Sequence, residues 1–130
     1  MAQDVALIEV SKGFVRVKML RRIADVAEAE TLQRQIASTA GTADVSSVLF
    51  DYRGVVGHDE SVRNSMWSGP APAVTVPTAL LVDSELSYVR MNMTAVSKRV
   101  LIRAFLSEHE ALAWLADPAS RRPTREVKPI

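Results

Sequence analysis

The central feature of the hydrophobic pattern is a run of consecutive apolar residues, Val48-Leu49-Phe50, that ends at Asp51. A strand that is apolar at successive positions is buried on both faces, which is typical of the interior of a mostly parallel sheet covered by helices. Residues 78–82 repeat the pattern and predict a second interior strand. In open α/β sheets the functional surface lies at the carboxyl ends of such strands. Residues 52–61 are therefore predicted to lie at the working edge of the sheet.

Alternating apolar and polar positions at the start of the chain predict a β-hairpin. Residues 5–10 form a short apolar run, and residues 14–20 alternate so that Arg16 and Lys18 share one face. In the tight connection between them, Gly13 is available for a positive φ angle. Residues 100–105 also alternate, with Arg103 outward, so this last strand is expected nearer an edge of the sheet.

Capping residues and helical spacing predict four helices. The first begins at Asp25, where Glu28 reaches back in a capping box, and Gly41 is expected to end it. A short helix is expected over residues 59–68, after the loop that follows the central strand. The third begins at Asp83 or Ser84, and the last begins at a capping box formed by Ser107 and Glu110.

The third helix has two apolar faces. Its buried stripe is expected to consist of residues at helical spacing, namely Leu86, Val89, Met93 and Val96. Its outer side is expected to carry Glu85, Arg90 and Asn92. The second apolar face comprises Tyr88, Met91 and Ala95. This face is a candidate surface for a dimer or a ligand, although scattered surface apolar residues need no such role.

The predicted order is β-β-α-β-α-β-α-β-α, a single α/β domain over residues 1–117. Residues 118–130 contain prolines and basic residues without apolar periodicity. This tail is expected to be flexible, or alternatively to act as a short basic arm that touches an acidic partner.

The amino-acid composition excludes several kinds of partner and several kinds of site. The net charge of the 130 residues is +1 and aromatic residues make up 5%, so neither nucleic acid nor an anionic membrane is an expected partner. The chain has no cysteine, which excludes disulfides, thiolate metal sites and cysteine nucleophiles. Residues 1–10 do not form a signal peptide and no apolar run is long enough to span a membrane. A soluble cytoplasmic protein without membrane insertion is predicted.

Signatures of catalysis are absent from the sequence. Gly54 and Gly57 have the spacing of neither a dinucleotide-binding motif nor a P-loop. No serine lies in a nucleophile-elbow motif. The densest polar group is His58-Asp59-Glu60-Ser61, and adjacent loop residues rarely ligate one metal ion together. We therefore predict no catalytic residue, no metal site and no cofactor. Ser61 lies at or near a helix N-terminus, so it is a candidate phosphoacceptor, with simple helix capping as the alternative.

The pattern resembles the STAS domain family, and in particular its SpoIIAA-like, anti-sigma-factor-antagonist-like members. The resemblance covers about residues 5–117. It rests on the initial hairpin, the strand Val48-Leu49-Phe50-Asp51 followed by Gly54-Val55, the acidic-serine helix start, and the ending from Phe105-Leu106-Ser107 to Trp114-Leu115. It implies a mixed, mostly parallel sheet of four or five strands, no catalysis, and protein–protein interaction in signalling or transcription regulation.

The resemblance also implies a location for the interaction, the loop and helix after the central strand. The antagonists commonly carry Asp-Ser-Ser-Gly there, with one serine phosphorylated by the partner kinase. The matching stretch here is Asp59-Glu60-Ser61-Val62, so Glu60 occupies the phosphorylated position and acts in that reading as a fixed negative charge.

The sequence thus predicts a non-catalytic module that binds a protein partner. Its partner-binding residues are expected to be His58, Asp59, Glu60, Ser61, Arg63 and Met66. Two alternatives remain. One is a carrier or sensor of a small apolar ligand or lipid, whose pocket would be lined by Met66, Trp67, Met91 and Met93. The other is an α/β enzyme that uses His58 and Ser61.

Overall fold

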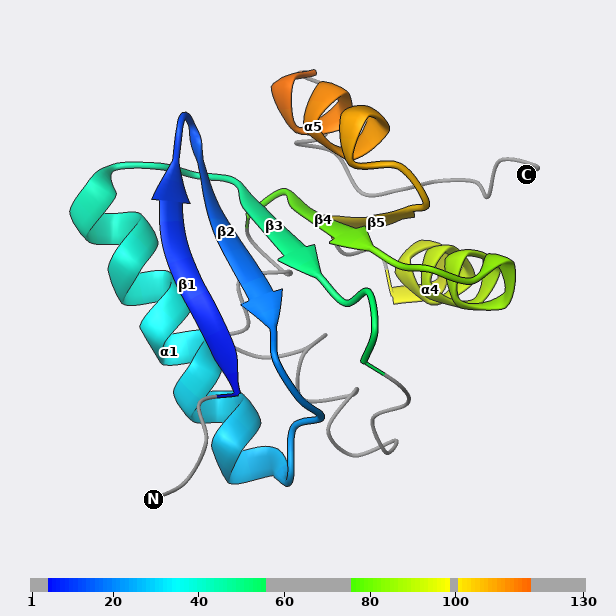
Figure 1. Cartoon of the computed structure of the whole chain (residues 1–130). Coiled ribbons are helices and arrows are strands. Elements are labelled where there is room, and N and C mark those ends of the chain that lie inside the picture. The colour runs from blue at the N-terminus through cyan, green and yellow to red at the C-terminus, as the bar shows by residue number, and fades with distance from the viewer. Residues whose placement is uncertain (1–4, 56–75, 99–100, 118–130) are drawn as a thin grey trace.

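The computed structural model describes residues 5–55, 76–98 and 101–117 (Figure 1). The strands are β1 (Ala6–Ser11), β2 (Phe14–Met19), β3 (Val48–Asp51), β4 (Thr78–Leu81) and β5 (Ile102–Phe105). The helices are α1 (Val26–Ala43), α4 (Glu85–Lys98) and α5 (Glu108–Ala116). The short helix expected over residues 59–68 and the tail of residues 118–130 lie outside the described residues.

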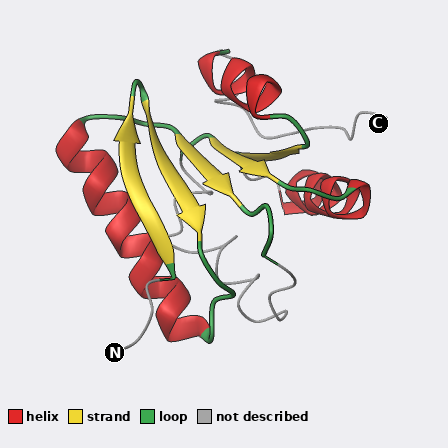
Figure 2. Cartoon of the chain, in the orientation of Figure 1, coloured by secondary structure: helices red, strands yellow, loops and turns green. Residues whose placement is uncertain are grey.

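The strands form one five-stranded sheet in the order β1-β2-β3-β4-β5. The β1–β2 pair is antiparallel, and the other three pairs are parallel. Helices α1 and α4 cover one face of the sheet and α5 lies on the other (Figure 2). This architecture confirms the predicted α/β class, the N-terminal hairpin and the mostly parallel mixed sheet.

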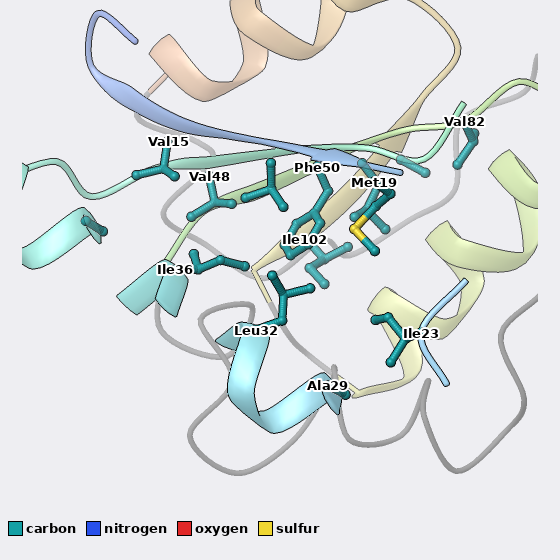
Figure 3. Packing of buried hydrophobic residues seen from close by; sticks show 14 of the residues in the cluster. Val15, Met19, Ile23, Ala29, Leu32, Ile36, Val48, Phe50, Val82 and Ile102 are labelled. Carbon is teal, nitrogen blue, oxygen red and sulfur yellow. The ribbon is translucent and has the colours of Figure 1, made fainter. Parts of the chain in front are cut away.

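The central strand is buried on both faces, as its apolar run predicts. Val48 and Leu49 are fully buried and Phe50 is 4% exposed. Val48 and Phe50 belong to the main core beneath α1, while Leu49 belongs to a smaller core beneath α5. Figure 3 shows side chains of the sheet pointing toward Leu32 and Ile36 of α1. Strand β3 therefore contributes side chains to both cores. Its burial on both faces fixes the position at which the chain leaves the sheet after Asp51.

The hairpin follows its alternating pattern. Val15, Val17 and Met19 are buried in the main core, and Arg16 and Lys18 project from the opposite face of the sheet. The connection contains Gly13 at φ 86°, a left-handed conformation that glycine adopts without a steric penalty. The basic residues of β2 therefore lie on the same side of the sheet as α5.

Helix α1 starts as predicted and ends later than predicted. The Asp25 carboxylate accepts a hydrogen bond of 2.8 Å from the Glu28 backbone N–H, and the Glu28 carboxylate accepts one from the backbone N–H of Ala24. The predicted stop at Gly41 is wrong, because the helix continues to Ala43 and Asp44 takes the left-handed conformation at φ 55°. Asp44 tolerates this angle because aspartate is among the residues that enter the left-handed region most readily.

The faces of α4 differ in part from those predicted, although Glu85 and Arg90 are exposed as expected. Leu86 and Met93 of the expected buried stripe are 59% and 58% exposed, whereas Asn92 of the expected outer side is 1% exposed. The reason is a pair of hydrogen bonds between the Asn92 amide and the backbone of Ala104 in β5, at 2.7 and 3.2 Å. Leaving those buried groups unpaired would cost more than exposing two apolar side chains on a helix that has two apolar faces.

The candidate dimer or ligand face on α4 is therefore largely inside the protein. Ala95 is fully buried in the main core, and Tyr88 and Met91 are partly buried against it. Ala95 therefore does not belong to an exposed face, whereas Tyr88 and Met91 keep part of their surface exposed.

Candidate functional site

Charged side chains gather on the α5 side of the sheet, toward the carboxyl ends of its parallel strands. We call this group the charged edge cluster, and its members are Arg16, Lys18, Asp51, Arg53, Asp83 and Glu108. They come from β2, from the end of β3 and the turn after it, from the residues after β4, and from the first turn of α5. Strand alternation places Asp51 on this face, since Phe50 before it points into the main core.

An ion pair between a buried carboxylate and a partly exposed arginine lies at the centre of the cluster. Asp51 is 5% exposed, and its carboxylate accepts hydrogen bonds of 2.9 Å from both Nε and Nη2 of Arg53. One of the same oxygens also accepts the Arg53 backbone N–H at 3.1 Å. The Arg53 side chain holds the pKa of Asp51 below its ordinary value, although burial of the carboxyl acts in the opposite direction. Asp51 is thus ionised at neutral pH, and its hydrogen bonds to Arg53 fix the turn after β3.

A second ion pair ties the cluster to α5. Glu108 Oε1 lies 2.7 Å from Arg16 Nη1 and 3.9 Å from Arg53 Nη2. Since Arg16 belongs to β2 and Arg53 follows β3, Glu108 bridges two neighbouring parts of the sheet from the N-terminus of α5. The carboxylate also lies where the helix dipole favours negative charge.

Hydrogen bonds donated by two backbone N–H groups hold the turn that follows β3. Gly54, at φ 84°, donates its backbone N–H to the Asp83 carboxylate over 2.9 Å, and Val55 donates to the carbonyl of Tyr52 over 3.1 Å. The turn of residues 52–55 is therefore held against the end of β4. The segment that begins at residue 56 starts from this point at the carboxyl edge of the sheet.

The residues predicted to bind a partner fall in that following segment. His58, Asp59, Glu60, Ser61, Arg63 and Met66 all lie outside the described residues. The sequence interpretation missed the ion pair of Asp51 with Arg53 and the approach of Arg53 to Glu108. The pair of Asp51 and Arg53 had a local signal, an acidic residue at the end of a buried strand with arginine two positions later. Glu108 had no such signal, since it is more than 50 positions away in the sequence.

The geometry of the cluster suits recognition better than proton transfer. Both oxygens of Asp51 are engaged by Arg53, so this carboxylate is a poor general base. Within the described ranges, no three histidine, cysteine, aspartate or glutamate residues are grouped as a metal site. Arg53 and Glu108, with side chains 47% and 40% exposed, offer one positive and one negative group to a second molecule.

The methionines of the alternative apolar pocket do not come together on α4. Met91 is partly buried against the main core, whereas Met93 is 58% exposed on the other side of the helix. Met66 and Trp67 lie outside the described residues. The two methionines of α4 therefore do not line one cavity, contrary to that prediction.

Comparison with known proteins identifies the fold. The sequence matches no known protein-family profile and no curated protein. The structure is similar to that of an uncharacterized protein from Shewanella loihica PV-4, described as a DUF3478 family member with a SpoIIAA-like fold. The similarity has a TM-score of 0.62 at 16% sequence identity and covers 89% of this chain and 99% of that one. The chain thus has a SpoIIAA-like fold, as the sequence resemblance implied.

Among the described residues, no helix is both long enough and apolar enough to cross a bilayer.

Proposed function

We propose that this chain is a non-catalytic protein-interaction module, and that its partner binds at the carboxyl edge of the parallel strands. The observation that carries the proposal is the charged edge cluster, where Arg53 and Glu108 are held in place and remain partly exposed. An arginine whose side chain is already ordered loses little conformational freedom when a partner carboxylate binds it. The edge therefore favours recognition of a protein surface that carries charges of both signs.

The proposed surface extends into the segment that follows the turn. His58, Asp59, Glu60, Ser61, Arg63 and Met66 are proposed to contact the partner, with Glu60 as a fixed negative charge and Ser61 as the phosphoacceptor. A phosphate on Ser61 would add about two negative charges next to Asp59 and Glu60, which would disturb the match between the charges of the two surfaces and weaken binding. A role in cytoplasmic signalling or transcription regulation, within one domain of residues 1–117, is part of the same proposal.

The experiment compares two pairs of substitutions with identical chemistry. The test variant is Glu60→Ala/Ser61→Ala, and the control is Glu30→Ala/Ser38→Ala on the exposed side of α1. Partner proteins are captured from the source cells on each immobilised variant, and the affinity of the purified partner is measured by calorimetry. We expect at least a tenfold loss of affinity in the test variant, about 1.4 kcal/mol, and wild-type affinity in the control.

Circular dichroism establishes that both variants are folded. Equal affinity of the partner for the wild type and for Glu60→Ala/Ser61→Ala would refute the assignment of the surface. Loss of binding in the α1 control would indicate that the partner binds to the opposite face of the sheet.

A further inference from the structure

The two edges of the sheet differ in how their backbone groups are satisfied. At the β5 edge, the Asn92 side chain of α4 accepts from the Ala104 backbone N–H and donates to the Ala104 carbonyl. At Ala104 this side chain occupies the positions that another strand would use, so it blocks the β5 edge at this residue. The opposite edge is β1, a strand of six residues that is paired only with β2 within the described part of the chain. Open edges of this length are templates for pairing with another chain.

The hairpin register identifies which groups of β1 point outward. The Leu20 backbone N–H donates to the carbonyl of Val5 over 2.9 Å, which makes these two residues a hydrogen-bonded pair. Hydrogen-bonded pairs alternate along an antiparallel ladder, so the register directs the backbone groups of every second residue of β1 toward β2. The N–H and C=O groups of the intervening residues, Ala6, Ile8 and Val10, point away from the sheet.

The exposed side chains of β1 are more typical of an interface than of an edge strand that faces solvent. Leu7 is 47% exposed and Val10 is 52% exposed, on opposite faces of the strand. Glu9 is the only charged residue of β1, and the strand contains no proline. Natural edge strands usually carry charges or proline that prevent pairing, and this one has little such protection.

We infer that β1 pairs antiparallel with β1 of a second copy of this chain, across a twofold axis that passes between the two Ile8 residues. In this register Ile8 faces Ile8 of the second copy, and Ala6 faces Val10 of the second copy. All three outward residues of each strand then form hydrogen-bonded pairs, with about six backbone hydrogen bonds in total. The result is one continuous sheet with ten strands, five from each copy.

The charges agree with this register. Because the axis lies at Ile8, Glu9 of one copy is opposite Leu7 of the other, and the two Glu9 residues are not directly opposite each other. Each Glu9 keeps its own cross-strand neighbour Arg16. Like charges directly opposite in a ladder are destabilising, and this arrangement avoids them.

The helices leave room for the pairing. Helix α1 packs on β1 and β2 alike, which centres it on the hairpin. Neighbouring strands are about 4.8 Å apart, so each α1 axis would lie about 5 Å to one side of the twofold axis. The two α1 helices are then about 10 Å apart, close to the distance at which packed helices make contact. The proposed dimer therefore buries a helix pair in addition to the strand pair.

Single cysteines test the register directly, because the chain contains none of its own. In the proposed dimer the two Cα atoms at position 8 are about 5.5 Å apart, within the range of a disulfide. At position 10 they are about 14 Å apart, beyond that range. We expect Ile8→Cys to form a disulfide-linked dimer under mild oxidation on a non-reducing gel, and the matched control Val10→Cys to remain monomeric on the gel.

The control is stringent because Val10 is the more exposed of the two positions. Random collision would link Val10→Cys at least as readily as Ile8→Cys. That result, or no linkage of Ile8→Cys, would overturn the proposed pairing.

Sedimentation of the full-length chain over a series of concentrations supplies a second readout. We expect a dimer for the wild type and a monomer for Val10→Pro, because proline removes an outward N–H and leaves the bonds to β2 intact. Leu7→Glu tests the same edge without changing the backbone and should also be monomeric, because it places a second carboxylate directly opposite Glu9 of the other copy. Leu86→Glu, at an exposed site on α4, should remain a dimer. A monomeric wild type, or dissociation caused only by Leu86→Glu, would contradict the inference.

Discussion

The two faces of the sheet have different compositions although the same strands build both. Beneath α1 and α4, the sheet contributes an apolar core that includes Val15, Val17 and Phe50. On the other face, α5 covers a smaller apolar cluster around Leu49 and Leu81, and the remaining surface carries the charged edge cluster. The first face contributes most of the buried apolar residues within the described ranges, and the second carries charged groups that remain partly exposed.

Strand β2 shows how this division arises from the sequence. Its odd-numbered residues are buried in the main core, whereas Arg16 and Lys18 project toward α5. Because side chains alternate along a strand, one strand contributes to stability on one face and to recognition on the other. Substitutions on the two faces should therefore separate into effects on folding and effects on binding.

The largest expected difference is between leucines of α1 and α5. Leu32 is 1% exposed in the main core, so Leu32→Ala should lower the free energy of unfolding by about 3 kcal/mol. Leu112 is partly buried on the α5 face, and Leu112→Ala should cost about 1 kcal/mol. Urea unfolding followed by circular dichroism measures both. Equal losses would mean that the two layers contribute equally to stability.

The next effect concerns the Asn92 side chain that blocks the β5 edge at Ala104. Asn92→Ala should lower the free energy of unfolding by about 2 kcal/mol, because it leaves the N–H and C=O of Ala104 without these partners. Hydrogen exchange should accelerate at the Ala104 amide in particular. Unchanged protection of that amide would show that another group or water satisfies it.

A smaller effect is expected for the ion pair on the charged face. Arg53→Ala should cost about 1 to 2 kcal/mol at pH 7, because Asp51 stays buried without its guanidinium partner. The pKa of Asp51 should rise, since burial opposes ionisation and the hydrogen bonds of Arg53 no longer offset it. Carboxyl-carbon NMR measures this titration. A double variant with Asp51→Asn should recover part of the stability, and failure to recover would mean that Arg53 stabilises through other contacts.

The smallest effect belongs to Glu28 at the start of α1. Its hydrogen bonds with Arg21 and with the backbone N–H of Ala24 lower the pKa of Glu28 from 4.5 to about 2. A lowered pKa means that this stabilisation is present above pH 4.5 and is lost as the pH falls toward 2. Glu28→Gln should cost about 1 kcal/mol at pH 7 and progressively less as the pH falls through that range. A cost that does not change with pH would assign the effect to packing instead of charge.

Much of the fold was predictable from local sequence. The apolar run at residues 48–50 predicted the central strand, and the alternation in β2 predicted a hairpin with one buried face. These predictions succeed because a strand buried on both faces needs consecutive apolar residues, whereas a strand buried on one face needs alternating apolar and polar residues. The cap at Asp25 is equally local, since its acceptor and donor are three residues apart.

The failures have other physical causes. The orientation of α4 depends on the bond between Asn92 and a strand 12 residues later in the chain, which a helical stripe does not encode. The end of α1 was predicted at Gly41, but the left-handed residue that follows the helix is Asp44. Aspartate is a weaker sequence signal for a helix end than glycine. In the candidate site, the contact of Glu108 with Arg16 and Arg53 depends on how β5 and α5 are placed against the sheet.

The most direct test of partner binding at the charged edge is NMR chemical-shift mapping of the labelled full-length chain titrated with its captured protein partner. We predict that the amides of Arg53, Gly54 and Glu108 shift together with those of residues 58–66, while the amides of Glu30 and Ser38 on α1 do not move. Shifts confined to α1 or α4, with those of the charged edge cluster unchanged, would contradict the account.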